Sequence, residues 1–417
     1  MSDFKPYRPR AIAAFNLLGR GAARFGLRSN LQPEFLIKAA RKKTGLQDFG
    51  DESFREPLDV LTRAIEAEAN LHPFGRWVMR GRLVGLLATR LRVQDLFTRH
   101  PEIAGEKIEA PLVIAGLQRT GTTMLHRLLA ADPDNRALLS WEAISPAPDP
   151  KQKSGARDAR IKQAEIAEKG LKYLAPEFFA IHPVEAEAPE EDVLLMEFAL
   201  MSQVPEAMMR IPSYSAWLKT QDAQPVYAYL KKLLQLLQWQ RGAQRWVLKT
   251  PAHLDHLDAL LTVFPDAKII QTHRDPTRTT ASFASMMTHG YGIFSDVVDS
   301  HAIAAHWHGN NARMMARALK VRAQKPESFI DVSYYDLIQD PMPQVERIYD
   351  FAGLALTAAA KEAMQASRKT NKQNKHGKHR YELTDFGLDQ ATVKADYADY
   401  LARFNIPSEQ DKEGAGA

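Results

Sequence analysis

The chain of 417 residues is longer than one ordinary domain, and its content of 45% hydrophobic and 25% charged residues is typical of a globular protein with a sizeable core. It contains no cysteine, which excludes disulfide bonds, thiolate catalysis and cysteine-ligated metals. The formal net charge of +5 favours anionic ligands only in a general way, so we expect no nucleic-acid partner.

The first 110 residues predict a helical N-terminal region. Apolar residues recur at three-to-four spacing in 56–71 and 76–97, which is the pattern of amphipathic helices. The first 30 residues interleave Arg and Lys with Phe, Leu and Ala, and this arm suits two roles, packing on the protein itself or peripheral contact with a membrane. Neither a signal peptide nor an apolar stretch of about 18 residues is recognisable, so we expect a cytoplasmic protein.

From residue 111 on, short β-like runs alternate with helical segments. The runs predicted to be strands are 111–116, 245–250, 267–274 and 327–334. Such alternation indicates βαβ units, so the expected fold is α/β, with a P-loop-NTPase-like parallel sheet flanked by helices in residues 111–417. A helical insertion at about 150–242 follows the first strand, and insertions at the carboxyl edge of a parallel sheet commonly form a ligand pocket.

The stretch "GLQRTGTT", residues 116–123, predicts a phosphate-binding turn. Gly116 and Gly121 lie between a predicted strand and a helix, whose backbone N–H groups and positive end suit a phosphate or a sulfate. In ATP- and GTP-binding loops the residue after the second glycine is a lysine that reaches the terminal phosphates, whereas here it is Thr122. Arg119, inside the loop, supplies a positive charge instead.

The predicted strand at 267–274 ends in His273 and Arg274, where a kinase or an ATPase would be expected to carry a metal-binding acid. Cations at this place predict that a second anionic group is neutralised by side chains and not by a divalent ion. Clustered histidines could suggest metal ligands, but these do not have the spacing of a zinc site. They are His253, His256, His301, His306 and His308. We therefore expect no metal.

Four segments in this order, "GLQRTGTT", "VLKTP", "IIQTHRDPTRTTASF" and "VSYYDLIQDP", resemble the sulfotransferases that use 3′-phosphoadenosine 5′-phosphosulfate (PAPS). The similarity covers roughly residues 111–355, and the loop is most similar to that of the bacterial branch that shares R-[ST]-G-T-T with the tyrosylprotein sulfotransferases. The resemblance implies a transferase that moves a sulfuryl group from PAPS to a hydroxyl or an amine and releases 3′,5′-adenosine bisphosphate.

The resemblance also implies how the 5′ end of the donor is bound. Arg119 would contact the 5′-phosphosulfate. The residues expected to bind the 5′-phosphate are Thr120, Gly121, Thr122 and Thr123. Tyr334 matches the tyrosine of the family's "YED" motif and is expected beside the nucleotide, while Met124 replaces the tryptophan that would stack on adenine.

The 3′-phosphate would be held by Arg274 and Ser282, since a guanidinium and a hydroxyl eight positions apart can converge on one dianion. The basic run at 368–380 loosely resembles the late segment that covers this phosphate in cytosolic sulfotransferases. Its candidate residues are Lys378 and Arg380, and the alternative for the run is a solvated basic loop.

Sulfuryl transfer needs stabilisation of the leaving phosphate and removal of the proton of the acceptor. Arg119 and Lys249, which ends the second predicted strand, are the expected cations. For the base the resemblance offers Glu142, downstream of the loop, and His253, two residues beyond the position where cytosolic members carry histidine. We expect Glu142 to be the base, with capping of a helix or pairing with an arginine as the alternative.

Two other functions stay open at this point, a metal-dependent nucleotide or small-molecule kinase and a non-catalytic nucleotide-binding module. The insertion is rich in Leu, Met, Tyr and Trp, which favours a small-molecule or lipid-like acceptor but also suits an ordinary core. The acidic run at 182–192 fits the N-terminus of the predicted helix that follows it, or else a loop at the edge of the pocket that shapes acceptor choice.

Overall fold

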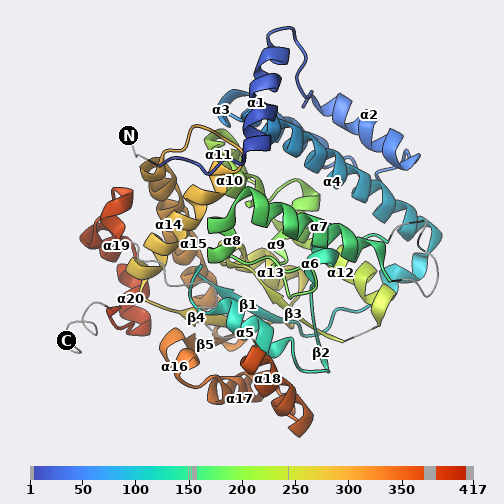
Figure 1. Cartoon of the computed structure of the whole chain (residues 1–417). Helices are drawn as coiled ribbons and strands as arrows, with labels where there is room; N and C mark the ends of the chain where they lie inside the picture. The colour runs from blue at the N-terminus through green and yellow to red at the C-terminus, as the bar shows by residue number, and fades with distance from the viewer. Residues whose placement is uncertain are drawn as a thin grey trace.

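The computed structural model describes residues 4–148, 150, 152, 157–242, 244–370 and 382–409. Its centre is a parallel sheet with the strand order β2-β3-β1-β4-β5 (Figure 1). The strands are β1 (Leu112–Gly116), β2 (Asn135–Ala137), β3 (Arg245–Lys249), β4 (Lys268–His273) and β5 (Phe329–Ser333). The expected α/β fold is thus confirmed. The sequence predicted four of these strands and missed the short β2.

Helices cover both faces and both ends of the sheet. The N-terminal region contains α1 (Arg10–Ala23), α2 (Pro33–Thr44), α3 (Arg55–Glu68), α4 (Pro73–Arg99) and the 3-10 helix η1 (Pro101–Gly105). Between β1 and β3 lie α5 (Thr122–Leu129), α6 (Ser140–Ile144), α7 (Ala159–Leu174), α8 (Pro176–Ile181), α9 (Val193–Met196), η2 (Glu197–Ala199), α10 (Val204–Met208), α11 (Pro212–Leu218) and α12 (Gln224–Arg241). The predicted helical N-terminal region and helical insertion are therefore both present.

The later helices complete the layers around the sheet. Between β3 and β5 are η3 (Pro251–Asp255), α13 (Leu257–Val263), α14 (Pro276–Gly292), α15 (Ser300–Gln324) and η4 (Pro326–Ser328). After β5 follow α16 (Tyr334–Gln339), α17 (Pro341–Ala352), α18 (Ala358–Thr370), η5 (Leu383–Phe386), α19 (Gln390–Asp396) and α20 (Ala398–Phe404). In Figure 1 the N-terminal helices lie above the sheet and α16 to α18 lie below it.

The core is divided by the sheet, because successive side chains of a strand point to opposite faces. On β1, Val113 packs into a large cluster with the N-terminal helices and α12, while Ile114 packs into a second cluster with α5 and α17. The strand is buried along its whole length, as continuous apolar strands of parallel sheets usually are. The larger cluster runs across residue 110, and the division of the chain there into two parts stays a prediction.

In the part of the chain that the structure describes, no helix combines the length and the apolar character that a segment crossing a bilayer needs.

Candidate active site

The turn after β1 is shaped by close packing against β4. A side chain at Gly116 would overlap the hydroxyl of Thr272, so the two strands can approach this closely only with glycine at that position. The Thr120 hydroxyl lies 2.6 Å from the Thr272 hydroxyl and donates to the carbonyl of Leu117, also at 2.6 Å. Thr120 is fully buried beneath the turn, and its side chain therefore holds the loop in shape.

Two residues of the turn adopt left-handed backbone conformations. Arg119 has φ 68°, which is uncommon for a residue other than glycine, and Gly121 has φ 85° at the N-cap of α5. The side chain of Arg119 is exposed and lines a cavity together with Gly121, Thr122 and Thr123. The first turn of α5 thus faces the cavity, as in an anion site at a helix N-terminus.

Arg274 lies directly after β4 and joins this cluster from a second segment. Its Nη1 donates to the backbone carbonyl of Arg119 at 2.9 Å, and its guanidinium lies 3.9 Å from the ring centre of Tyr334. The Tyr334 ring packs against Gly121, where an added Cβ would be 3.1 Å from it. The structure therefore brings the predicted residues Arg119, Gly121, Arg274 and Tyr334 together at the carboxyl edge of the sheet.

The other residues predicted for the 3′ end of the donor are placed less directly. Ser282 is half-buried on α14, one helical turn after Arg278, and is not among the residues that line the cavity. Lys378 and Arg380 lie outside the described residues.

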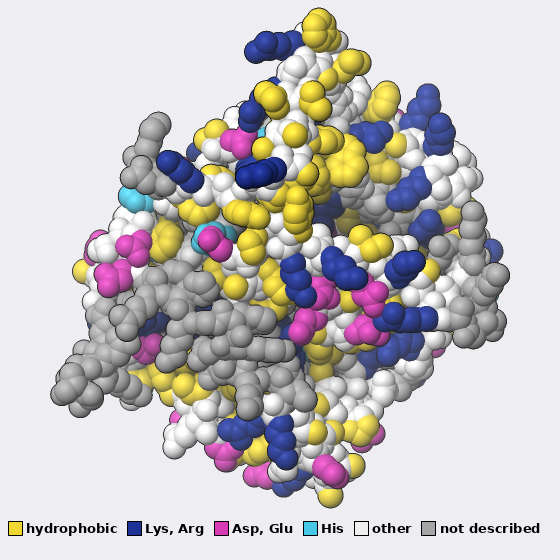
Figure 2. Space-filling model, in the orientation of Figure 1, with side chains coloured by type: hydrophobic (Ala, Val, Ile, Leu, Met, Phe, Trp, Pro, Cys, Tyr) yellow, Lys and Arg dark blue, Asp and Glu magenta, His cyan; other side chains and the backbone are white. Residues whose placement is uncertain are grey.

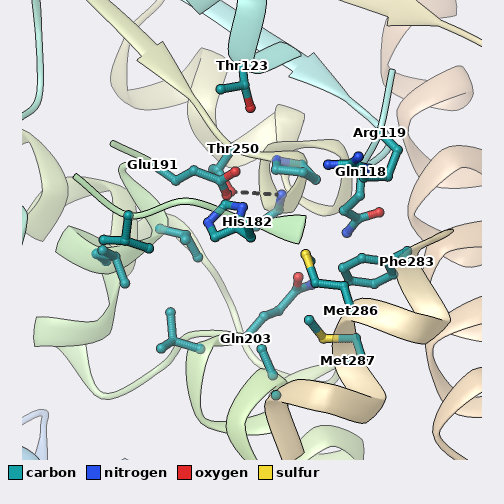
Figure 3. A pocket seen from close by; sticks show the side chains of 18 of the residues that line it. Gln118, Arg119, Thr123, His182, Glu191, Gln203, Thr250, Phe283, Met286 and Met287 are labelled. Atoms are coloured by element: carbon teal, nitrogen blue, oxygen red, sulfur yellow. Dashed lines mark hydrogen bonds between the residues drawn. The ribbon is translucent and has the colours of Figure 1, made fainter. Parts of the chain in front are cut away.

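The cavity has a volume of about 500 Å³ and joins two different environments. One end carries the loop residues, Arg274, Tyr334 and Thr250. The other end is mainly apolar, with Gln203 beside Met286 and Met287 as a polar exception (Figure 3). It lies between α8, α9, α10 and α14, and its apolar lining side chains are Phe178, Val193, Leu194, Val204, Met208, Phe283, Met286, Met287, Ile293, Phe294 and Trp307. Figure 3 shows Phe283, Met286 and Met287 on one side of this space, with Arg119, Thr250 and Glu191 above them. Volume and lining suit a small-molecule ligand.

Residues of the acidic run at 182–192 line the cavity where its two ends join. Lys249 donates to Glu191 with 2.6 Å between Nζ and Oε1, and the Thr250 hydroxyl donates to Glu191 Oε2 at 3.2 Å. Lys249 is buried and does not line the cavity itself, while Glu191 and Thr250 do. Glu191 thus carries a carboxylate at the boundary between the loop and the apolar space.

His182 also lines the cavity, next to the same charges. Burial lowers the pKa of its imidazole, the charges of Glu190 and Glu191 act in the opposite direction, and those of Lys249 and Arg119 lower it further. The net direction is downward, so the ring is neutral at neutral pH. Glu190, in contrast, is held in the wall, since its two oxygens accept from the Glu191 backbone N–H at 2.8 Å and the Ser140 hydroxyl at 3.3 Å.

Comparison with known proteins identifies the family of the chain. The family model described as the sulfotransferase family matches residues 111–358, which include the loop, Glu191, Lys249, Arg274 and Tyr334. The chain belongs to the sulfotransferase family. The predicted membership of the sulfotransferase family is therefore confirmed.

Solved mycobacterial sulfotransferases have the same fold over most of the chain. The crystal structure of sulfotransferase STF1 from Mycobacterium tuberculosis is 35% identical, with a TM-score of 0.77, and the match covers 88% of this chain and 98% of that one. Sulfotransferase STF9 from Mycobacterium avium is 28% identical, with a TM-score of 0.82, and the match covers 90% of this chain and 97% of that one.

Curated relatives are similar over a shorter part. The omega-hydroxy-beta-dihydromenaquinone-9 sulfotransferases Stf3 of Mycobacterium bovis and Mycobacterium tuberculosis are each 25% identical over 264 residues. This match covers 59% of the present chain and 63% of each relative, so the chain spans less than two thirds of their length.

Within this sulfotransferase fold, Glu142 does not lie where a base for an acceptor in the cavity would act. It is fully buried on α6 and does not line the cavity. Its Oε1 accepts from Arg136 Nη2 and Arg241 Nη1, both at 2.9 Å, and its Oε2 accepts from the backbone N–H of Leu139 at 3.1 Å. These contacts correspond to the structural alternative for Glu142, helix capping and arginine pairing, and favour it over the assignment of Glu142 as the base.

His253 is likewise enclosed and does not line the cavity. Its Nδ1 lies 2.9 Å from the hydroxyl of Tyr227, and its Nε2 lies 2.9 Å from Asp192 Oδ2. Burial by itself raises the pKa of Asp192, but the charge and hydrogen bond of His253 outweigh it, and the net pKa is lowered. Asp192 Oδ1 also accepts from the backbone N–H of Lys249 at 2.9 Å. The His253–Asp192 pair therefore stabilises the end of β3 from outside the cavity.

Two of the histidines considered as metal ligands each contact one acid. His306 Nε2 lies 3.1 Å from Glu206, and His308 Nε2 lies 2.7 Å from Asp396. Among the described residues, no group of three or more His, Asp or Glu side chains could hold a metal ion.

The sequence missed His182 and Glu191 as site residues. For the acidic run, the sequence allows either a helix N-terminus or the edge of a pocket, and the structure supports the pocket edge for Glu191. The sequence did contain a signal for Glu191. A run of acidic residues in an insertion at the carboxyl edge of the sheet can reach a cation at the end of a strand. Sequence spacing could not identify which acid meets Lys249.

Proposed function

We propose that the protein transfers a sulfuryl group from PAPS to a hydroxyl or an amine of a hydrophobic small molecule. The observation that carries this proposal is the continuous cavity that has a cationic phosphate-type loop at one end and an apolar chamber at the other. Membership of the sulfotransferase family supports sulfuryl transfer over the kinase and the non-catalytic module.

In this proposal the N–H groups at the start of α5 bind the 5′-phosphate, and Arg119 neutralises the phosphosulfate. The hydroxyl of Thr120 is engaged with Thr272 and Leu117, so its contribution comes from the backbone and not from the side chain. Arg274 binds the 3′-phosphate with Ser282 and with Lys378 and Arg380 of the basic run. Tyr334, which packs on both Gly121 and Arg274, supports the wall of the nucleotide site.

We assign the base to Glu191 in place of Glu142. In the structure its carboxylate is occupied by Lys249 and Thr250, which are the groups expected to turn to the donor. When they bind the phosphosulfate, Glu191 is released to accept the proton of the acceptor. The acceptor oxygen or nitrogen then forms a bond to sulfur, the bond between sulfur and the bridging oxygen breaks, and Arg119 and Lys249 stabilise the charge on the leaving phosphate.

The acceptor is proposed to be lipid-like, because side chains of Phe, Met, Leu, Val, Ile and Trp dominate its end of the cavity. The Stf3 relatives are named for an omega-hydroxylated dihydromenaquinone, which agrees with an apolar acceptor that presents a hydroxyl. His182, neutral and next to Glu191, would orient the acceptor hydroxyl.

A binding comparison tests the donor. Isothermal calorimetry of the full chain with 3′,5′-adenosine bisphosphate, and separately with ATP and Mg²⁺, should give measurable affinity for the bisphosphate without any metal. The Arg274→Ala variant should weaken that affinity by about tenfold or more, because it removes a charge-assisted contact. Tighter binding of ATP with Mg²⁺ would reverse the choice of donor and restore the kinase.

A further inference from the structure

Helix α1 turns its apolar side chains away from the protein. Of its residues only Asn16 is buried. The side chains of Phe15, Leu17 and Leu18 are exposed to 43%, 70% and 74%. A helix of a globular protein usually buries its apolar stripe. An amphipathic helix whose apolar stripe faces outward is therefore expected to bind another surface.

Polar contacts and close backbone packing, not an apolar core, fix α1 in place. The side-chain oxygen of Asn16 accepts from the backbone N–H of Phe74 at 2.9 Å, and Arg20 forms an ion pair with Asp296. Gly19 lies against Pro73 so closely that a larger residue would clash. The helix is therefore held firmly on the first turn of α4 while its outer face stays uncovered.

Side chains next to α1 extend this exposed area. Trp77 of α4 is 55% exposed and lies 6.3 Å from Phe15 between ring centres. Phe25 and Leu27, directly after α1, are largely exposed as well. We call the set Phe15, Leu17, Leu18, Phe25, Leu27 and Trp77 the N-terminal apolar face. Figure 2 shows hydrophobic side chains gathered over this part of the molecule, with Lys and Arg side chains among them. Exposed apolar side chains that gather in one place often mark an interaction site.

The segment that carries this face is basic, and the acid described next to it, Asp296, is paired with Arg8 and Arg20. Residues 4–33 contain no Asp or Glu, whereas they contain Lys5, Arg8, Arg10, Arg20, Arg24 and Arg28. Arg10, Arg24 and Arg28 are exposed beside the apolar residues. Aromatic and aliphatic side chains bordered by arginines match the composition of helices that lie in the headgroup region of an anionic bilayer.

The same arm is tied to the wall of the cavity. Arg8 donates to the carbonyls of Ile293 and Ser295 at 3.2 and 3.1 Å, and His72 Nε2 lies 3.1 Å from the carbonyl of Ile293. Ile293 and Phe294 line the apolar end of the cavity. The apolar face and the acceptor end of the cavity are therefore parts of one hydrogen-bonded unit.

We propose that the N-terminal apolar face docks the protein on an anionic lipid bilayer, with α1 parallel to the surface and the acceptor end of the cavity close to it. The sequence left two roles open for this arm, and the outward orientation of Leu17 and Leu18 together with the absence of Asp and Glu from residues 4–33 favours the membrane. Delivery of a lipid-like acceptor from the bilayer rests on the proposed function, whereas docking itself does not.

The test is co-sedimentation of the full chain with vesicles of phosphatidylcholine alone and of phosphatidylcholine mixed with phosphatidylglycerol. The wild type should bind the mixed vesicles, and more weakly as salt is raised. The double variant Leu17→Glu/Leu18→Glu should lose about tenfold or more in binding, because it removes apolar area and repels the headgroups. The double variant Ile166→Glu/Tyr173→Glu on α7 adds the same charge to other exposed apolar positions and should bind like the wild type.

Equal binding by the wild type and the Leu17→Glu/Leu18→Glu variant would overturn the proposal, as would equal loss in both double variants. So would light scattering that shows a wild-type dimer converted to a monomer by the change in α1, since the face would then meet a second copy. Thermal unfolding checks that both variants are folded. The assay contains neither donor nor acceptor, so its result is independent of the bisphosphate titration that tests the proposed function.

Discussion

Glu409 occupies the guanidinium of Arg274, with Oε1 2.7 Å from Nε and Oε2 3.1 Å from Nη2. The backbone N–H of Glu409 also donates to Asp275 Oδ2 at 2.9 Å, so the C-terminal segment is fixed beside the end of β4. If Arg274 binds the 3′-phosphate, the carboxylate of Glu409 competes with that phosphate for the guanidinium. This relationship connects the last described residue of the chain to the proposed nucleotide site.

We expect the Glu409→Gln variant to bind 3′,5′-adenosine bisphosphate about three- to tenfold more tightly, because a phosphate no longer has to displace a charged partner of Arg274. Calorimetry measures the change. Glu327→Gln, at an exposed site in η4, is the matched control and should leave the affinity unaltered. Weaker binding by Glu409→Gln would mean that Glu409 positions Arg274 for the nucleotide and does not compete.

The assignment of the base predicts that Glu191→Gln lowers kcat by about a hundredfold or more, since general base catalysis typically contributes that much. The affinity for 3′,5′-adenosine bisphosphate should stay within a few-fold of that of the wild type. Turnover is followed by release of the bisphosphate with a hydroxylated apolar acceptor. Glu187→Gln, in the same acidic run but paired with Arg157 at the surface, is the control. Unchanged kcat in Glu191→Gln would rule out this base.

Glu142 gives the complementary prediction. Its removal leaves Arg136 buried without its carboxylate partner, and breaking a buried pair of this kind costs about 3 kcal/mol or more of the free energy of unfolding. The Glu142→Ala variant should therefore unfold at a lower urea concentration than the wild type. Its turnover per folded molecule should be retained when activity is measured at urea concentrations below the unfolding transition. A loss of kcat at unchanged stability would return Glu142 to the catalytic role.

The pH dependence of stability should reveal His72. Burial, together with the charge of Arg8, lowers its pKa from 6.5 to about 4. Because the folded pKa is below the unfolded one, the unfolded state takes up a proton first, and stability is lost as the pH falls from about 6.5 towards 4. This window corresponds to about 3 kcal/mol.

His72→Asn removes this titration and keeps a side chain that can accept from the N–H of Gly75, as His72 does at the start of α4. The difference in free energy of unfolding between wild type and variant, measured by urea titration at several pH values, should shrink as the pH is lowered. A difference that is constant from neutral pH to pH 4 would contradict the lowered pKa.

Much of the fold could be predicted because it is encoded locally. The strands β1, β3, β4 and β5 are short apolar runs next to helical segments, and the turn at Gly116 has a recognisable spacing. The strand β2 has the sequence Asn-Arg-Ala and pairs only with β3, so nothing in its composition identifies it. The position of β2 in the sheet depends on its pairing with the edge of β3.

The site could be predicted only in part, because several of its contacts join distant segments. The loop, Arg274 and Tyr334 belong to motifs, and the structure brings them together. Glu191 meets Lys249 across a long helical insertion, and its role could not be read from spacing. Glu142 satisfied the expected sequence position, yet two arginines from separate segments enclose it.

Because a side chain at Gly116 would overlap Thr272, we expect substitutions at these two positions to be coupled. A relative with alanine or serine at the first position must either carry a smaller residue at the second or open the gap between β1 and β4. The second course would also detach the hydroxyl of Thr120 and distort the turn. We therefore expect a change at Gly116 to keep the shape of the loop only when position 272 changes with it.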